Sequence, residues 1–227
     1  MIGFTVAGVA GFGGGLIVLP AMIWVFGPKE AVPILAVTQS IGMITRVWFN
    51  WQDVNWQLAR WFWVGAIPVT VLSSMLFVVV PADILRRMIG VLMLLLVTQA
   101  HTRFKEKLKP KLRGFILVGA GSGFINGFLG VGGGIVAPFF INYGVRGASY
   151  IGTFSMIALV TQTIKLSVFG QANLLGPHVI ALGLLLGALA FAGSFIGRRL
   201  VGRLPEHGFD LLVESVLGIS GLLLLIK

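Results

Sequence analysis

The phrase Gly-x-Gly-Gly-Gly occurs twice in this chain, and each copy is followed within a few residues by proline. The first copy is Gly11–Gly15 with Pro20, and the second, 119 residues later, is Gly130–Gly134 with Pro138. Glycine costs roughly 1 kcal/mol against alanine inside a helix, so each copy predicts a break in a helix. Both copies lie in apolar stretches, and irregular backbone is tolerated in lipid only where it is buried in protein or lines a cavity. The repeat therefore indicates a duplicated membrane protein whose helix breaks line a pathway.

The composition identifies lipid as the surroundings of this fold. Hydrophobic residues make up 57% of the chain and charged residues 11%, whereas an average soluble domain carries about 25% charge. Runs such as 58–80 and 180–197 meet or approach the roughly 20 apolar residues that a spanning helix needs. No basic region precedes the first apolar run, so we expect no secretory signal peptide. The absence of cysteine excludes disulfides and thiolate metal sites.

The order of apolar and polar segments predicts two homologous halves of four elements each. The apolar segments lie near 2–26, 31–51, 57–80, 84–102, 114–142, 147–169, 177–200 and 209–226. A basic loop at 103–113 separates a first membrane repeat, 1–102, from a second, 114–227. Outside the glycines, the halves also match at Asn55 and Asn173, Gly65 and Gly183, and Arg46 and Lys165. The sequence thus predicts an all-α, polytopic membrane protein built by duplication.

The location of the basic residues explains the net charge of +10 without a nucleic acid. The loop at 103–113 holds six of them, namely Arg103, Lys105, Lys107, Lys109, Lys111 and Arg113. A basic loop beside spanning helices is typical of the cytoplasmic side, and no interleaved aromatic residues indicate nucleic-acid binding. We therefore expect this loop to be cytoplasmic and the lipid bilayer to be the partner of the fold.

The distribution of positive charge also distinguishes two topologies. If all eight segments span, the two faces carry seven positive residues each and no inside is defined. If the glycine-broken first element of each half enters and leaves on one side, the face of the basic loop carries ten positive residues against four. Three spans per half also invert the second half relative to the first. The charges therefore favour an inverted repeat with re-entrant or deeply broken first elements.

These features resemble the sulfite exporter TauE/SafE family of membrane permeases. The resemblance rests on the glycine-proline phrases, on second helices that begin at Ala31 and Ala148, and on an asparagine-containing turn after each. It extends over nearly the whole chain. The halves depart from each other in one respect, because four residues separate Gly15 from Pro20 and three separate Gly134 from Pro138. The resemblance implies a multi-pass permease of the cell membrane that transports small anions such as sulfite or sulfonates.

The glycine phrases themselves are candidate substrate-binding residues. Where a broken element restarts as a helix, its first N–H groups are unpaired and carry partial positive charge, and glycine lets an oxyanion approach the backbone. Two such ends related by symmetry would hold one anion from both sides. The alternative is that these glycines only allow close helix packing. The residues concerned are Gly13, Gly14, Gly15, Gly132, Gly133 and Gly134.

The second helix of each half adds polar candidates for the same site. Gln39 and Arg46 are seven residues apart on one face, and Gln162 and Lys165 are three apart on one face. Intramembrane Arg and Lys cost about 2.5–3.5 kcal/mol on insertion scales, so a cation at a matching position in each half predicts a functional role. The alternative is that these long side chains extend to the headgroups, which Arg46 is near enough to reach.

The sequence says less about the energy coupling of transport and about enzymatic or metal chemistry. Glu214 is a candidate proton site, although an interior-negative potential alone drives anions outward. The chain has no nucleophile–base motif and no histidines at metal-ligand spacing, so we expect neither an enzyme nor a bound metal or cofactor. An anion channel and a non-transporting membrane scaffold stay open as alternatives to a carrier. The substrate, the direction of transport, the coupling ion and a homo-oligomeric state are not determined by these patterns.

Overall fold

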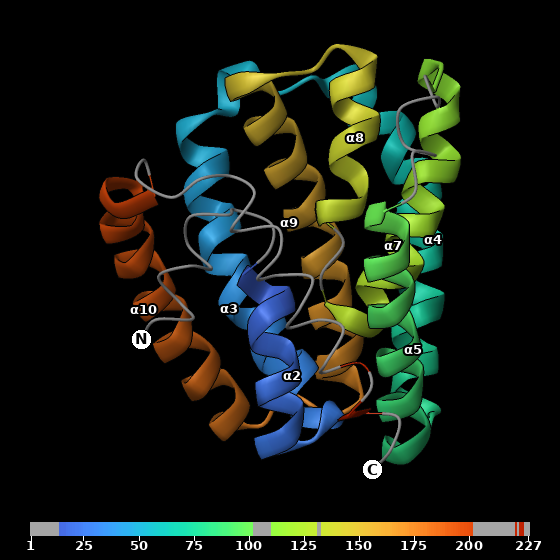
Figure 1. Ribbon diagram of the computed structural model, residues 1–227, viewed down its shortest axis with the longest axis vertical. Helices are drawn as coiled ribbons and strands as arrows, with labels where there is room; N and C mark the ends of the chain where they lie inside the picture. Colours follow the sequence, from blue (N-terminus) through green and yellow to red (C-terminus); the bar gives the residue numbers. More distant parts are fainter. Residues whose placement is uncertain (1–13, 102–109, 131–132, 202–220, 222, 225–227) are drawn as a thin grey trace.

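The computed structural model describes residues 14–101, 110–130, 133–201, 221 and 223–224, and every regular element in them is a helix (Figure 1). Three helices are long and apolar enough to cross a membrane, namely α3 (Pro28–Phe49), α4 (Trp56–Val79) and α9 (Gly147–Gln171). The remaining helices are α2 (Gly14–Phe26), α5 (Ala82–His101), α7 (Phe115–Leu129), α8 (Gly133–Tyr143) and α10 (Pro177–Val201), with single 3₁₀ turns at Trp51–Asp53 and Leu112–Gly114. The prediction of an all-helical fold with helices long and apolar enough to span a membrane is thereby confirmed.

The short connections between the helices gather at two opposite ends of the bundle. One end, which we call the basic-loop end, holds the turns at 50–55, 110–114 and 144–146, and the ring of Phe115 packs there against Tyr143 at 5.2 Å. The other, which we call the Lys29 end, holds Gly27 and the turns at 80–81 and 172–176. At this end the Lys29 ammonium donates to the carbonyl oxygens of Phe77 and Val78, at 2.8 and 2.6 Å.

Local sequence explains several helix boundaries. Gly27 adopts a positive φ of 74° between α2 and α3, and Pro28 then begins α3, a position where proline's missing N–H costs nothing. Asn55 caps α4, because its side-chain oxygen accepts a hydrogen bond from the backbone N–H of Leu58 at 3.0 Å. Its predicted counterpart Asn173 takes a left-handed φ of 57° in the turn after α9. Both asparagines therefore shape turns, by different means.

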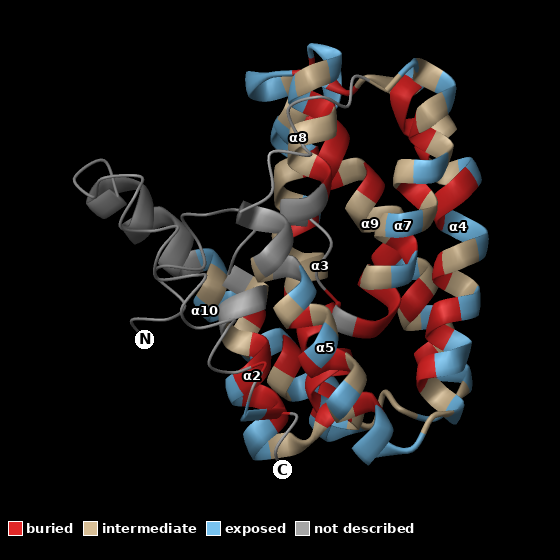
Figure 2. Cartoon of the chain, turned by 45° about the vertical axis from the view of Figure 1, so that its right-hand side comes forward, coloured by how far each residue is buried: buried red, intermediate tan, exposed pale blue. Residues whose placement is uncertain are grey.

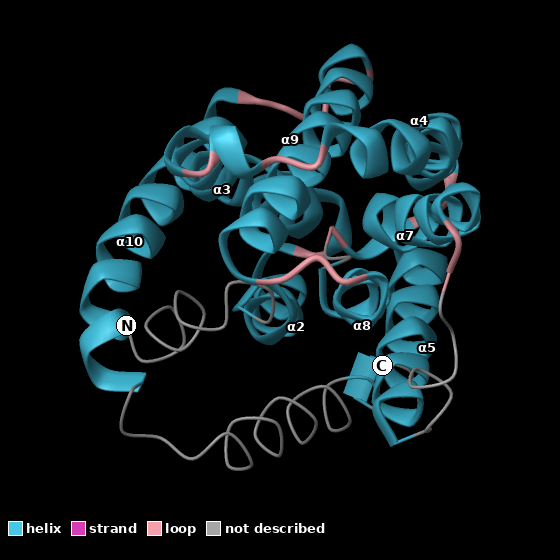
Figure 3. Cartoon of the chain, turned by 90° about the horizontal axis from the view of Figure 1, so that it is seen from above, coloured by secondary structure: helices cyan, strands magenta, loops and turns pink. Residues whose placement is uncertain are grey.

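The helices of the two halves interleave. The crossing of α3 and α9 is antiparallel, because Gln39 meets Gln162 while Asn50, just after α3, meets Gly152 near the start of α9. Parallel packing joins α10 to α3, where Thr38 Oγ1 donates to Gly183 O at 3.1 Å. Seen end-on, α10, α3, α9, α4 and α7 form an arc around α2 and α8 (Figure 3). The antiparallel α3 and α9 suit an inverted repeat, which stays a prediction for the chain as a whole.

Helix α7 on the arc and helix α8 inside it form a hairpin. Phe115, the first residue of α7, packs against Phe140 and Tyr143 near the end of α8. The hairpin therefore begins and ends at the basic-loop end. A positive φ of 70° at Gly130 ends α7, and α8 begins at Gly133. With about 1.5 Å of rise per residue, the 15 residues of α7 extend roughly 22 Å into the bundle. The tip of the hairpin thus lies deep among the other helices.

Glycines one turn apart let α7 pack directly on the backbone of α4. A Cβ at Gly119 would overlap the carbonyl oxygen of Phe62, and one at Gly127 would overlap the Ser73 hydroxyl. The same is true in reverse at Gly65, whose Cβ would overlap the backbone of Ile116. Small residues at this spacing are how membrane helices approach closely without a hydrophobic driving force. Glycines of α7 and α4 therefore have a packing role, as do Gly183 and Gly187 of α10 where it packs on α3.

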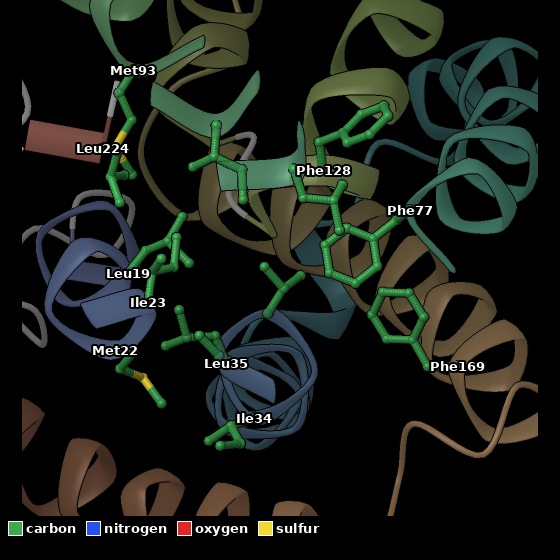
Figure 4. Packing of buried hydrophobic residues seen from close by; sticks show 14 of the residues in the cluster. Leu19, Met22, Ile23, Ile34, Leu35, Phe77, Met93, Phe128, Phe169 and Leu224 are labelled. Carbon is green, nitrogen blue, oxygen red and sulfur yellow. The ribbon is translucent and has the colours of Figure 1, made fainter. Parts of the chain in front are cut away.

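Two apolar clusters fill the bundle (Figure 2). The one nearer the basic-loop end includes Met43, Leu58, Phe62, Phe115, Phe140 and Phe154. The other, nearer the Lys29 end, includes Leu19, Ile23, Leu35, Phe77, Phe128 and Phe169 (Figure 4). Because Phe115 belongs to the first and Phe128 to the second, α7 passes from one cluster into the other. The hairpin is held along its whole depth.

Candidate functional site

Two glutamines meet at the crossing of α3 and α9. Gln162 Nε2 donates to Gln39 Oε1 at 2.9 Å, and Gln162 is 2% exposed. This bond uses one donor and one acceptor, and it leaves Gln39 Nε2 and Gln162 Oε1 buried without a partner among the residues that the structure describes. A buried polar atom without a hydrogen bond is costly, so this crossing is a place where a polar ligand would be stabilised.

Lys165 lies one turn further along α9 and is fully buried. Its ammonium donates to the backbone oxygen of Asn126 at 3.2 Å and lies over the ring of Phe169, 6.0 Å from the ring centre. A Cβ placed on Gly130 would lie 3.3 Å from the ammonium nitrogen. The cation therefore touches the tip of the α7–α8 hairpin.

The end of α7 explains why the lysine lies there. The backbone N–H of Gly130 also donates to Asn126 O, at 2.8 Å, so this carbonyl accepts from both the helix cap and the ammonium. The last carbonyls of a helix carry partial negative charge, which favours a cation at that position. The Asn126 side chain adds a weaker link, because its Nδ2 lies 3.4 Å from Thr161 Oγ1 on α9. Backbone and side chain together hold the hairpin tip against α9.

The charge of Lys165 is only partly compensated. No carboxylate among the described residues forms an ion pair with it, and its one hydrogen bond goes to a neutral carbonyl. An intramembrane cation is expensive and in most proteins is paired or faces a polar cavity. This arrangement can hold an anion at the hairpin tip, close to where α8 begins. Within the described part of the chain, no three His, Cys, Asp or Glu side chains could share a metal ion.

The structure brings three of the predicted side chains together, since Gln39, Gln162 and Lys165 all lie at or beside the α3–α9 crossing. Arg46 does not join them. It is half-buried and lies seven residues beyond Gln39 toward the basic-loop end, about 10 Å of helix, whereas Lys165 lies about 5 Å from the crossing in the opposite direction. The two matched cations thus lie on opposite sides of the glutamine pair.

The predicted glycines divide between described and undescribed residues. Gly14 and Gly15 are the first residues of α2, and Gly133 and Gly134 are the first of α8. Both helices begin near mid-height in the bundle and then run toward opposite ends (Figure 1). Three further predicted residues, Gly13, Gly132 and Glu214, lie outside the described residues.

Sequence reasoning did not single out the Asn126 backbone oxygen as a partner of Lys165. The signal that would have pointed to it is Gly130, because a glycine just after a helix is typical of a left-handed cap whose N–H bonds a carbonyl one turn earlier. Reading Gly130 as the end of α7 places the free carbonyls of that helix beside the break. A cation on a neighbouring helix then has a natural acceptor.

Comparison with known proteins identifies the family of the chain. The chain matches the family described as sulfite exporter TauE/SafE over residues 1–224. It is also 24% identical over 250 residues to a protein of Methanocaldococcus jannaschii described as a probable membrane transporter, with all of this chain and 94% of that protein covered. No solved structure matches the chain.

Proposed function

Because the chain belongs to the sulfite exporter TauE/SafE family of membrane transporters, we propose that it is a multi-pass carrier of the cell membrane for small sulfur-containing or organic anions, such as sulfite or sulfonates. The observation that carries this proposal is the fully buried ammonium of Lys165 at the tip of the α7–α8 hairpin. An anion that reaches it gains a direct charge partner in a region from which water is largely excluded, where such an interaction is strong.

The neighbouring polar groups extend the site. Gln39 contributes an unpaired amide donor, and the first N–H groups of α2 and α8 supply partial positive charge from Gly14–Gly15 and Gly133–Gly134. In this proposal the two halves form an inverted repeat, so that α2 and α8 present their glycine ends to one substrate from opposite directions. The antiparallel crossing of α3 and α9 supports that arrangement.

Arg46 has a separate role in this proposal. It lies on the basic-loop side of the glutamine pair, so an anion moving between that end and Lys165 passes it. We assign it to the entry path, where a half-buried guanidinium attracts anions toward the crossing. Net export needs no coupling ion, because an interior-negative potential is worth about 2.3 kcal/mol per charge per 100 mV.

Flux measurements in proteoliposomes test this function. Purified protein is reconstituted and loaded with sulfite, sulfoacetate or chloride, and efflux is followed under an imposed membrane potential with and without a pH gradient. We expect saturable, potential-driven efflux of a sulfur anion that empty liposomes lack. Conductance that rises without saturation would instead indicate a channel, and the absence of flux for all three anions would contradict the proposed substrate class.

A further inference from the structure

The glutamine pair offers a ligand two complementary groups at once. Gln39 Nε2 is a buried donor without a partner among the described residues, and Gln162 Oε1 is a buried acceptor in the same condition. This outcome does not depend on which way either amide is turned. A single hydrogen bond between two amides always leaves one amino group and one carbonyl oxygen free.

The unpaired acceptor, Gln162 Oε1, restricts which anions the site can bind. A bare anion, such as chloride or a fully ionised oxyanion, can accept from Lys165 and from the Gln39 amide, but it has nothing to donate to Gln162 Oε1. With such an anion in the site, that buried oxygen stays unpaired and is repelled by the incoming negative charge. The acceptor therefore selects against anions of this kind.

The position of the acceptor relative to the cation fits one small ligand. Gln162 and Lys165 are three residues apart on one face of α9, and Gln39 joins Gln162 through a bond of 2.9 Å. An oxyanion at the hairpin tip can thus direct one oxygen to the ammonium and a second to the glutamine pair. Both glutamines lie on the side of Lys165 that faces the basic-loop end.

We propose that the transported anion carries a hydrogen-bond donor of its own, an acid O–H or a hydroxyl, which it donates to Gln162 Oε1 while its negative oxygens accept from Lys165 and Gln39 Nε2. This inference rests on the proposed function and names the substrate class more narrowly. Hydrogen sulfite and hydroxyalkanesulfonates belong to the favoured class. Sulfinates and sulfonates without a hydroxyl, and halides, do not.

The test compares two monoanions of the same shape. Hydrogen sulfite and methanesulfinate differ in a hydroxyl replaced by a methyl group on sulfur, so only the first can donate. Saturable efflux of hydrogen sulfite is measured in proteoliposomes at mildly acidic pH, where the monoanion predominates, and methanesulfinate is added as a competitor. We expect the wild-type protein to bind hydrogen sulfite about tenfold more tightly, since one buried acceptor is left unpaired in the other complex.

The variant Gln162→Met removes the acceptor and keeps the side-chain length, so it is expected to bring the two apparent affinities together. Gln171→Met, at the exposed last residue of α9, is the matched control and should keep the tenfold preference. If Gln162→Met does not fold, Gln39→Glu serves instead. It keeps the oxygen that accepts from Gln162 and replaces the free donor by a carboxylate oxygen, so it should abolish binding of both anions.

The outcomes separate the two proposals. Saturable sulfite flux with equal affinities in the wild-type protein would overturn the donor requirement and leave the proposed function standing. A preference that persists in Gln162→Met, or anion binding unaffected by Gln39→Glu, would also overturn it. No saturable flux of hydrogen sulfite would contradict the proposed function itself, and the inference would fail with it.

Discussion

The ammonium nitrogen of Lys165 lies 3.3 Å from the point where a side chain at Gly130 would begin. At Gly130 the end of α7 requires a left-handed backbone, and the Lys165 ammonium requires space beside it. Only glycine meets both requirements without strain. The contact joins the second glycine phrase to α9.

Replacing Gly130 by alanine should affect both fold and transport. At a φ of 70° the added methyl costs about 1–2 kcal/mol of backbone strain, and it also pushes against the Lys165 ammonium. Gly147→Ala is the control, because its φ of 58° is also positive and nothing lies within 4 Å of the new methyl. Both variants should unfold at a lower temperature than the wild-type protein, whereas sulfite flux should fall only in Gly130→Ala. Equal flux in the two variants would show that Lys165 does not contact the transported anion.

Substitution by methionine should have different effects at the buried Lys165 and at the half-buried Lys29. Lys165→Met removes a charge-assisted contact to substrate, so the concentration for half-maximal flux should rise at least about tenfold, with little loss of stability because an unpaired buried cation is also removed. Lys29→Met deprives two carbonyls of α4 of their donor and should lower the free energy of unfolding by about 1–3 kcal/mol at unchanged apparent affinity. The reverse pattern would place the substrate at Lys29.

Substitutions within α7 test the close approach to α4. Gly119→Ala inserts a methyl against the Phe62 carbonyl, which belongs to backbone and cannot move aside, so we expect a loss of about 1–3 kcal/mol. Gly121→Ala, two residues away on an exposed face with nothing within 4 Å, should be neutral or stabilise the helix by about 0.5–1 kcal/mol. Unfolding in detergent micelles measures both. Similar stabilities would show that α7 and α4 are not in direct backbone contact.

Orientation in the membrane can be measured directly, because the chain has no native cysteine. Arg146→Cys lies at the basic-loop end and Asp83→Cys at the Lys29 end, and both positions are exposed. A membrane-impermeant maleimide added to intact cells should label Asp83→Cys, while Arg146→Cys should react only after permeabilisation. The opposite pattern would reverse the orientation that the basic loop predicts. Labelling of both from outside would contradict the separation of the two ends.

The sequence is sufficient to predict the helical class of the fold and part of the candidate site. Apolar runs predicted the membrane helices because lipid leaves few alternatives to helix, and the spacing of Gln162 and Lys165 placed both on one face. The contact between Gln39 and Gln162 could not be predicted, because it depends on where two helices from different halves cross. Arg46 was grouped with Lys165 by sequence match, yet the antiparallel crossing separates them.

The glycines likewise show that the sequence does not specify which helices pack together. Adjacent glycines break a helix, whereas the close packing of two helices needs small residues one turn apart. Residues with that spacing, Gly119, Gly123 and Gly127, lie just before the second phrase and pack on α4. Their role depends on which helix they face, and a periodic pattern of small residues does not specify the neighbour.

The hydrogen bonds from Lys29 to Phe77 and Val78 connect residues 48 and 49 positions apart in the chain. The ribosome synthesises Lys29 before the acceptors at the end of α4 exist. During insertion, these two hydrogen bonds can therefore form only after the end of α4 has been made. The start of α3 thus gains its connection to α4 only after a later helix has been completed. A ribosome stalled before Phe77 would leave α3 without the two hydrogen bonds that Lys29 donates.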